Sequence, residues 1–157
     1  MNPHLDISVH GGDWPDEQKL RVLAQAAIRA AIAEARLEMP QDAELSLVFT
    51  TDGEMRSINA QWRGMDKPTN VLSFPAADIR PGEAGEQMLG DIVLAAETIA
   101  REAALEGRRF EDHLSHLMVH GFLHLFGYDH LDDAEAMVME NLETRALAAL
   151  GISDPHA

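Results

Sequence analysis

Three histidines that could hold a metal ion are concentrated in one short segment, HGFLHLFGYDH (residues 120–130). His120 and His124 are four residues apart, so on a helix they lie one turn apart on the same face. His130 could not join them on a continued helix, because ten residues would carry it about 15 Å along the axis. Gly127 is suited to a reversal of the chain between them, since glycine adopts positive φ at little cost. The spacing therefore predicts three imidazole ligands on one metal ion, with one coordination position left open.

Two further histidines, His113 and His116, continue the same helical face. His116 is also four residues from His120, so these two form an alternative ligand pair. Only His120 and His124 are followed by a glycine turn and a third histidine, which favours the later pair and leaves His116 to support a ligand or to pack in the core. Three histidines with an open position are typical of catalytic zinc sites, which activate water for hydrolysis. Such a site also accepts nickel and other borderline metals.

The spacing H-x-x-x-H-x-x-G-x-x-H is also that of the metzincin proteases. Those enzymes carry a glutamate directly after the first histidine, where it acts as the general base. This chain has Gly121 at that position, and glycine cannot accept a proton. The segment keeps the metal ligands of a protease without its base, so a metalloprotease is the weaker alternative.

The rest of the chain must supply the scaffold that positions these histidines. Alternating apolar residues predict strands, and apolar residues at helical spacing between caps, glycine and proline predict helices. Their order indicates an α+β fold, with a single mixed sheet of about four strands packed with about five helices, one of them a metzincin-like metal helix. We see no repeat or linker, so residues 1–157 are expected to form one domain, and Met137 and Met139 are expected in its core. The expected strands are residues 5–10, 43–50, 70–75 and 89–95, and the expected helices are residues 16–37, 50–63, 96–107, 110–127 and 132–151.

A second segment, WRGMDKPT (residues 62–69), concentrates positive charge in an acidic chain. Arg63 and Lys67 flank its glycine-containing loop, and Arg56 precedes them on the same expected helix. Arginine can bind a phosphate through two hydrogen bonds, and it stabilises the charge that develops when a phosphodiester is hydrolysed. The alternative is that Arg63 is a solvated helix end and KPTN an ordinary turn.

Four other residues have weaker assignments. Asp91 is expected to be mainly structural, with support of a metal ligand as the alternative. Asp129 is also expected to be mainly structural, but it could orient a ligand histidine or act as a base. Ser73 is expected to be a core or groove hydroxyl. Trp62 could stack on a nucleobase, although core packing is the simpler interpretation.

Composition excludes several classes of protein. The 157 residues are 46% hydrophobic and 25% charged, as in a globular domain, and no apolar run reaches the roughly 18 residues of a membrane span. The start MNPHLDISVH lacks the features of a signal peptide, and the absence of cysteine excludes thiolate ligands and fits a cytoplasmic protein. The formal net charge of −15 argues against a protein that coats itself in nucleic acid. Any RNA binding should therefore be weak, sensitive to salt and dependent on a partner for targeting.

The histidine segment and two others together resemble the YbeY family of bacterial metal-dependent endoribonucleases. NAQWRGMDKPTNVLSFP (residues 59–75) and LGDIVLA (residues 89–95) match the family's other motifs, in the same order as the family has them. The resemblance covers nearly the whole chain, with little signal in the first 40 residues and in the loop 78–87.

The resemblance implies a single-strand-specific, metal-dependent endoribonuclease that acts in 16S rRNA 3′-end maturation and late ribosome quality control. It implies one metal ion, usually zinc, on His120, His124 and His130, and it places the family's functionally important arginine on Arg63. Single-stranded rRNA and the ribosome or a ribosomal protein are the implied partners. No residue stands out as an assured general base, which leaves a non-enzymatic alternative: a zinc-containing ribosome assembly factor that recruits nucleases.

Overall fold

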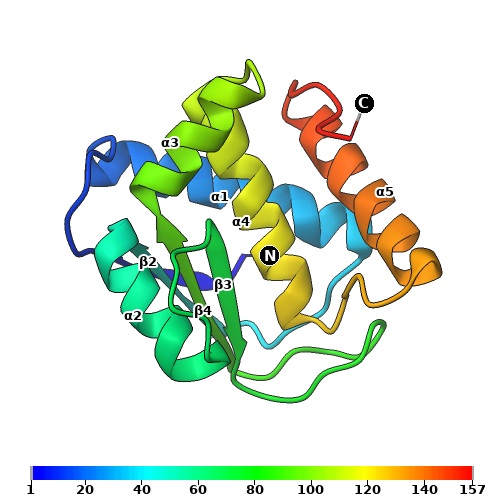
Figure 1. Ribbon diagram of the computed structural model, residues 1–157. Helices are drawn as coiled ribbons and strands as arrows, with labels where there is room; N and C mark the ends of the chain where they lie inside the picture. Colours follow the sequence, from blue (N-terminus) through cyan, green and yellow to red (C-terminus); the bar gives the residue numbers. More distant parts are fainter. Residues whose placement is uncertain (1, 157) are drawn as a thin grey trace.

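The fold is described by a computed structural model for residues 2–156. Within these residues four strands form one mixed sheet and five helices pack around it, which confirms the predicted α+β fold (Figure 1). The elements in chain order are β1 (His4–Val9), α1 (Glu17–Ala35), β2 (Glu44–Thr50), α2 (Asp52–Arg63), β3 (Val71–Pro75), β4 (Met88–Ala95), α3 (Ala96–Leu105), α4 (Phe110–Leu125) and α5 (Asp133–Ala149).

The strands are arranged in the order β1-β2-β4-β3. β1 pairs in parallel with β2, β2 pairs in parallel with β4, and β3 runs antiparallel to β4. β3 is therefore an edge strand, and the functional site is built beside it.

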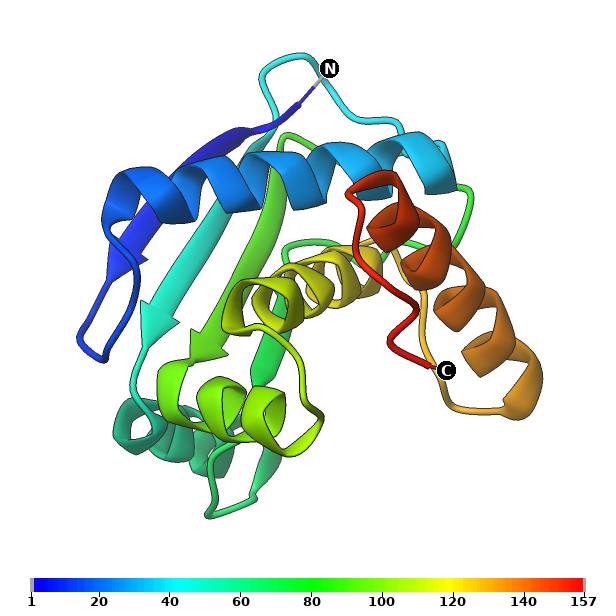
Figure 2. The same cartoon turned by 90° about the horizontal axis from the view of Figure 1, so that it is seen from above.

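Helices cover both faces of the sheet. Side chains of α1, α4 and α5 form the larger core with the apolar residues on one face of β1, β2 and β4, and Figure 2 shows α1 lying across the strands. The smaller core lies on the opposite face, where Met55 of α2 packs with Leu72 and Val93. Because side chains alternate along a strand, Ile92 joins the larger core and Val93 the smaller one.

α4 carries the predicted metal ligands and is buried along most of its length. At Gly121 the helix lies very close to the sheet, since a Cβ atom there would come within 3.0 Å of both Ile92 Cγ2 and Ser73 Oγ. The Ser73 hydroxyl donates a hydrogen bond to the Gly121 carbonyl at 2.9 Å, which places it in the groove, as expected. The position directly after His120 therefore faces the sheet, and a glutamate side chain has no room there.

Two predictions of core packing are wrong. Met137 is 64% exposed, because the buried face of α5 is formed by Met139 and the residues one and two turns beyond it. Trp62 is 66% exposed, because it lies in the last turn of α2, near the edge strand. Met139 is buried, as predicted. Within residues 2–156, every helix is too short or too polar to cross a membrane.

Candidate metal centre

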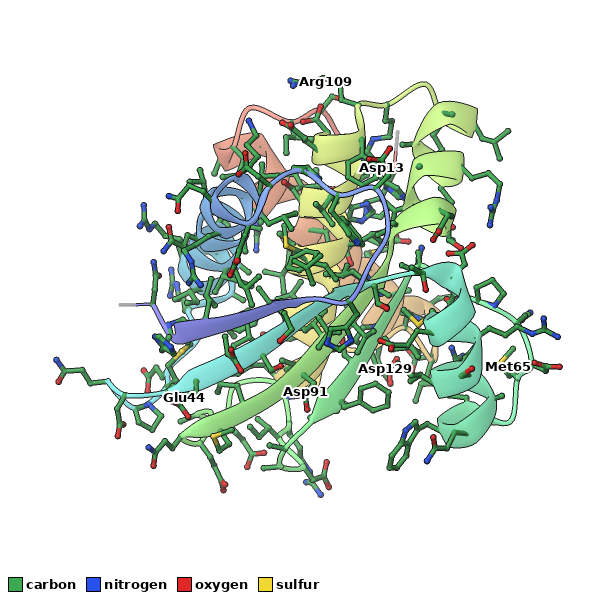
Figure 3. All side chains as sticks on the ribbon, turned by 90° about the vertical axis from the view of Figure 1, so that its left-hand side faces the viewer. Asp13, Glu44, Met65, Asp91, Arg109 and Asp129 are labelled. Atoms are coloured by element: carbon green, nitrogen blue, oxygen red, sulfur yellow. The ribbon has the colours of Figure 1, made fainter. Side chains whose placement is uncertain are left out.

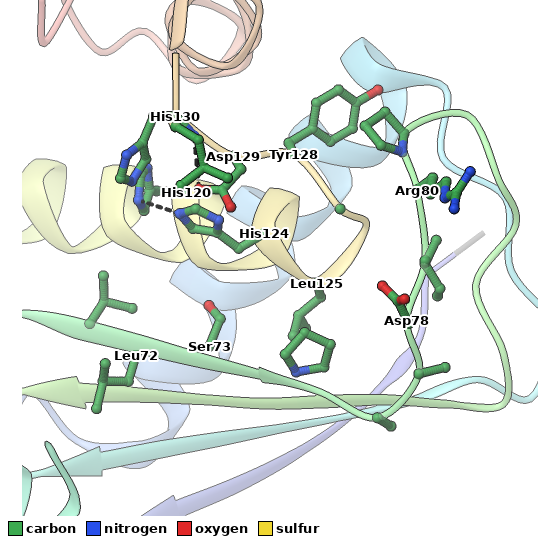
Figure 4. A pocket seen from close by; sticks show the side chains of 18 of the residues that line it. Leu72, Ser73, Asp78, Arg80, His120, His124, Leu125, Tyr128, Asp129 and His130 are labelled. Carbon is green, nitrogen blue, oxygen red and sulfur yellow. Dashed lines mark hydrogen bonds between the residues drawn. The ribbon is translucent and has the colours of Figure 1, made fainter. Parts of the chain in front are cut away.

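The three histidines predicted as ligands lie together at the C-terminal end of α4 (Figure 4). One ring nitrogen from each of His120, His124 and His130 lies within 4.8 Å of the other two. The Nε2 atoms of His120 and His124 are 3.0 Å apart. His120 and His124 are partly buried while His130 is exposed, so the group opens to solvent on one side. Three convergent imidazole nitrogens with an open side suit zinc, and the residues present therefore fit the metal that the sequence implies.

The turn that returns the chain to His130 depends on Gly127. This residue has φ +91°, and its N–H donates a hydrogen bond to the His124 carbonyl at 3.0 Å. A Cβ atom on Gly127 would lie 2.1 Å from the Ile79 carbonyl oxygen. Only glycine satisfies both the backbone angle and this close contact.

A carboxylate from α5 fixes the orientation of the first ligand. Glu143 is 2% exposed, and its Oε2 accepts a hydrogen bond from His120 Nδ1 at 2.6 Å. Its Oε1 is 2.7 Å from His116 Nε2 and 3.1 Å from His156 Nε2. With the proton of His120 held on Nδ1, Nε2 is left free to bind a metal ion.

The charge on this carboxylate is stabilised by its neighbours. Burial by itself raises the pKa of Glu143, but the hydrogen bonds from His116 and His120 outweigh burial and hold the pKa well below its usual range. Glu143, His116 and His156 also lie close enough to form a second group of metal donors. The first group is the better candidate for a metal site because it lies beside the larger of the two cavities, about 1010 Å³ against about 480 Å³.

His124 is held in the form that binds metals. The pKa of His124 is lowered from an ordinary value of 6.5 to about 4, mainly by burial and next by the neighbouring His120, while the charge of Asp129 acts in the opposite direction. At neutral pH the ring is therefore uncharged and can act as a ligand.

A cavity of about 1010 Å³ lies in front of the histidines. It is bounded by β3, the segment 76–81, the last turn of α4 and the segment 127–131. Arg63 and Arg80 line it with positive charge. Asp78 and Asp129 supply carboxylates, and Figure 4 labels both of them together with Arg80. An anionic substrate with a reacting centre near a metal ion suits this combination of groups.

The other candidate residues lie outside this cavity. The Arg56 guanidinium donates two hydrogen bonds to Asp66, from Nε to Oδ1 at 2.7 Å and from Nη2 to Oδ2 at 3.0 Å. Lys67 is exposed and does not line the cavity. Asp91, labelled in Figure 3, is exposed on β4. Since Ile92 faces α4, strand alternation turns Asp91 to the opposite face of the sheet, away from the histidines.

Three residues of the site were not found from the sequence. Glu143 belongs to a helix whose pattern is that of any amphipathic helix, and its contact with His120 spans 23 positions in the chain. Asp78 and Arg80 belong to a loop without periodicity, DIRPGEAGEQ. The only signal for Glu143 is general: a histidine ligand needs an acceptor for its second nitrogen, and α5 is rich in acidic residues.

The fold and the site together define an α+β protein with a three-histidine candidate metal centre beside an arginine-lined cavity. The chain belongs to the endoribonuclease YbeY family, whose model matches residues 10–151.

Similar proteins cover nearly the whole chain. The endoribonuclease YbeY of Sinorhizobium fredii is 56% identical over 97% of this chain and 91% of its own length. That of Rhizobium meliloti is 56% identical, covering 97% and 94%, and that of Agrobacterium fabrum is 54% identical, covering 98% and 94%. The solution structure of TM1509 from Thermotoga maritima matches with a TM-score of 0.56 at 23% identity, covering 98% of this chain and 99% of that one. This last similarity supports the fold alone.

Proposed function

We propose that this protein is a metal-dependent endoribonuclease that cleaves single-stranded RNA in the cavity between α4 and β3. The observation that carries the proposal is the convergence of His120, His124 and His130 on a cavity that Arg63 also lines. The relatives named above are endoribonucleases, and they align with nearly the full chain.

Different residues of the cavity have different roles in the proposed cleavage. Zinc on the three histidines would lower the pKa of a water molecule and polarise the phosphodiester. Arg63 and Arg80 bind the phosphate and stabilise the charge that builds on its oxygens. Asp129 and Asp78 line the same cavity and are the carboxylates available to accept a proton.

The distribution of charge favours a single strand over a duplex. Duplex binding relies on many lysine and arginine contacts to phosphates, whereas the net charge here is −15 and two arginines line the cavity. Arg56 is neutralised by Asp66. A flexible strand can place one phosphate at the metal without requiring a wide basic surface.

The biological role follows the family resemblance. We propose that the substrate is the 3′ end of precursor 16S rRNA, that cleavage contributes to ribosome quality control, and that the protein acts in the cytoplasm. Because the chain is strongly acidic, we propose that the ribosome or a ribosomal protein supplies much of the affinity for the substrate.

The test is cleavage of a labelled single-stranded RNA by purified protein, combined with elemental analysis. Cleavage should stop on chelation, return with zinc, and be lost in His124→Ala; Arg56→Ala is the control that should retain it. Cleavage by metal-free His124→Ala would overturn the mechanism. A wild-type protein that binds zinc and precursor ribosomes but cleaves no RNA would instead support the assembly-factor alternative.

A further inference from the structure

Trp62 exposes an unusually large apolar surface. It is 66% exposed, although tryptophan is highly buried on average. The chain's other tryptophan, Trp14, packs against Phe49 and Phe110 with ring centroids 5.1 and 5.9 Å apart. Trp62 therefore adds little to the core, and its exposure calls for another explanation.

Two neighbouring residues connect Trp62 with the cavity. It directly precedes Arg63, which lines the cavity. Its ring packs edge-on against Phe74 of β3, with centroids 5.9 Å apart. Phe74 lies between Ser73 and Pro75, and both of these residues line the cavity.

The cavity and Trp62 therefore lie on the two sides of one edge strand. Strand alternation turns Ser73 towards α4, where it contacts Gly121, and turns Phe74 towards α2. Because β3 is the last strand in the sheet order, a strand of RNA that leaves the cavity can cross this edge and reach the indole ring.

We propose that Trp62, supported by Phe74, is a stacking subsite for an unpaired nucleobase of the RNA whose phosphate is held by Arg63. The inference rests on the proposed function and names what the site recognises next to the cleaved bond. An acidic chain gains little RNA affinity from charge, whereas stacking on an aromatic ring needs no charged group and accepts any base. Because a paired base cannot stack in this way, the subsite also provides a reason for single-strand preference.

Fluorescence measures this contact directly. In Trp14→Phe the only remaining tryptophan is Trp62, and a single-stranded oligoadenylate should quench its emission in the presence of a chelator, which prevents cleavage. An oligonucleotide of equal length with abasic spacers should bind more weakly and should not quench. Equal quenching by both would overturn the proposal. If Trp14→Phe does not fold, the quenching lost between wild type and Trp62→Phe gives the same information.

Substitution separates stacking from general apolar contact. Trp62→Ala should weaken oligoadenylate binding and raise KM about tenfold with kcat unchanged. Trp62→Phe should lose less than about threefold, and Trp62→Leu should resemble alanine because leucine cannot stack. Leu105→Ala, at another exposed apolar residue, is the matched control and should have no effect.

The results also distinguish this inference from the proposed function. If Trp62→Ala binds RNA as well as wild type does, the stacking subsite is overturned; this is the result expected if the ring instead docks a protein. Cleavage of RNA by the wild-type protein would then still support the nuclease. Wild-type protein that does not cleave RNA but shows base-dependent quenching would overturn the nuclease and support the subsite.

Discussion

His120 Nδ1 and Glu143 Oε2 are 2.6 Å apart, and this contact joins the candidate metal centre to a helix 23 residues further along the chain. It orients the imidazole and places its proton away from the metal side. The same carboxylate contacts His116 and His156 through its other oxygen. The last helix and the C-terminal segment therefore support His120, the first candidate ligand.

Glu143→Gln tests this support. We expect the zinc dissociation constant to rise about 10- to 100-fold, because the neutral amide holds His120 less strongly in the binding tautomer. The matched control is His156→Gln, which removes a contact to Oε1 and leaves Oε2 on His120; it should change zinc affinity less than about threefold. Competition with a chromophoric chelator measures both constants. Equal losses in the two variants would contradict a specific role for the His120 contact.

Arg63→Gln is expected to lower kcat/KM for RNA cleavage by a factor of about 10² or more, because a charged donor to the phosphate is removed. Arg56→Gln should stay within about threefold of wild type, since Arg56 is paired with Asp66 outside the cavity. The salt dependence of RNA binding gives a second measurement, in which loss of one phosphate contact reduces the slope of log K against log salt by about 1. Comparable losses in both variants would show that only general positive charge matters.

Much of the scaffold was predictable because its signals are local. Each strand and helix was expected within about two residues of its observed bounds, since alternation, caps and glycines are read over a few positions. The histidine cluster was predicted from the same kind of signal: one helical turn, then a glycine that permits a reversal. Its role as a metal site stays a prediction.

What the sequence did not show depends on contacts between distant segments. The strand order β1-β2-β4-β3 and the burial of Glu143 are set by packing. Trp62 was expected in the core because tryptophan usually is, yet its place at the end of α2 leaves it exposed. In the sequence, Gly121 stood out because a protease has its glutamate base at that position. The structure shows in addition that α4 packs closely against the sheet at this residue.

The stability of the metal-free protein should fall as the pH is lowered from about 6.5 to about 4, partly through His124. Its pKa is lowered to about 4 in the fold, so between these values the unfolded chain binds more protons and acid favours unfolding. One such proton contributes up to about 1.4 kcal/mol per pH unit, less with partial exposure. Denaturant unfolding at a series of pH values should show a shallower slope for His124→Gln than for wild type. Identical slopes would contradict the lowered pKa.

Gly127→Ala should disrupt the turn that returns His130 to the site. The new Cβ would meet the Ile79 carbonyl at 2.1 Å, and backbone cannot move aside as a side chain does. Gly151 is the matched control, since it has φ +76° with open space around it. Gly151→Ala should cost about 1 kcal/mol of unfolding free energy from backbone strain alone. Gly127→Ala should cost at least about twice that and weaken zinc binding. Similar costs in the two variants would show that the contact with Ile79 is unimportant.

Gly121→Ala tests whether the glycine that stands where a protease has its glutamate base is also needed for α4 to pack against the sheet. Alanine gains up to about 1 kcal/mol of helix propensity over glycine, but here its Cβ would lie 3.0 Å from Ile92 and Ser73, and overpacking costs about 1–3 kcal/mol. Gly53→Ala is the control, since in the first turn of α2 the nearest atom, Thr51 Oγ1, is 3.8 Å away and no close contact opposes the gain in helix propensity. Denaturant unfolding should therefore show Gly53→Ala at or above wild-type stability and Gly121→Ala below it.

Gly121→Glu should be the least stable of the three and should cleave no peptide, because its carboxylate would have to enter the contact between α4 and β3. A stable Gly121→Glu protein with peptidase activity would reinstate the protease alternative.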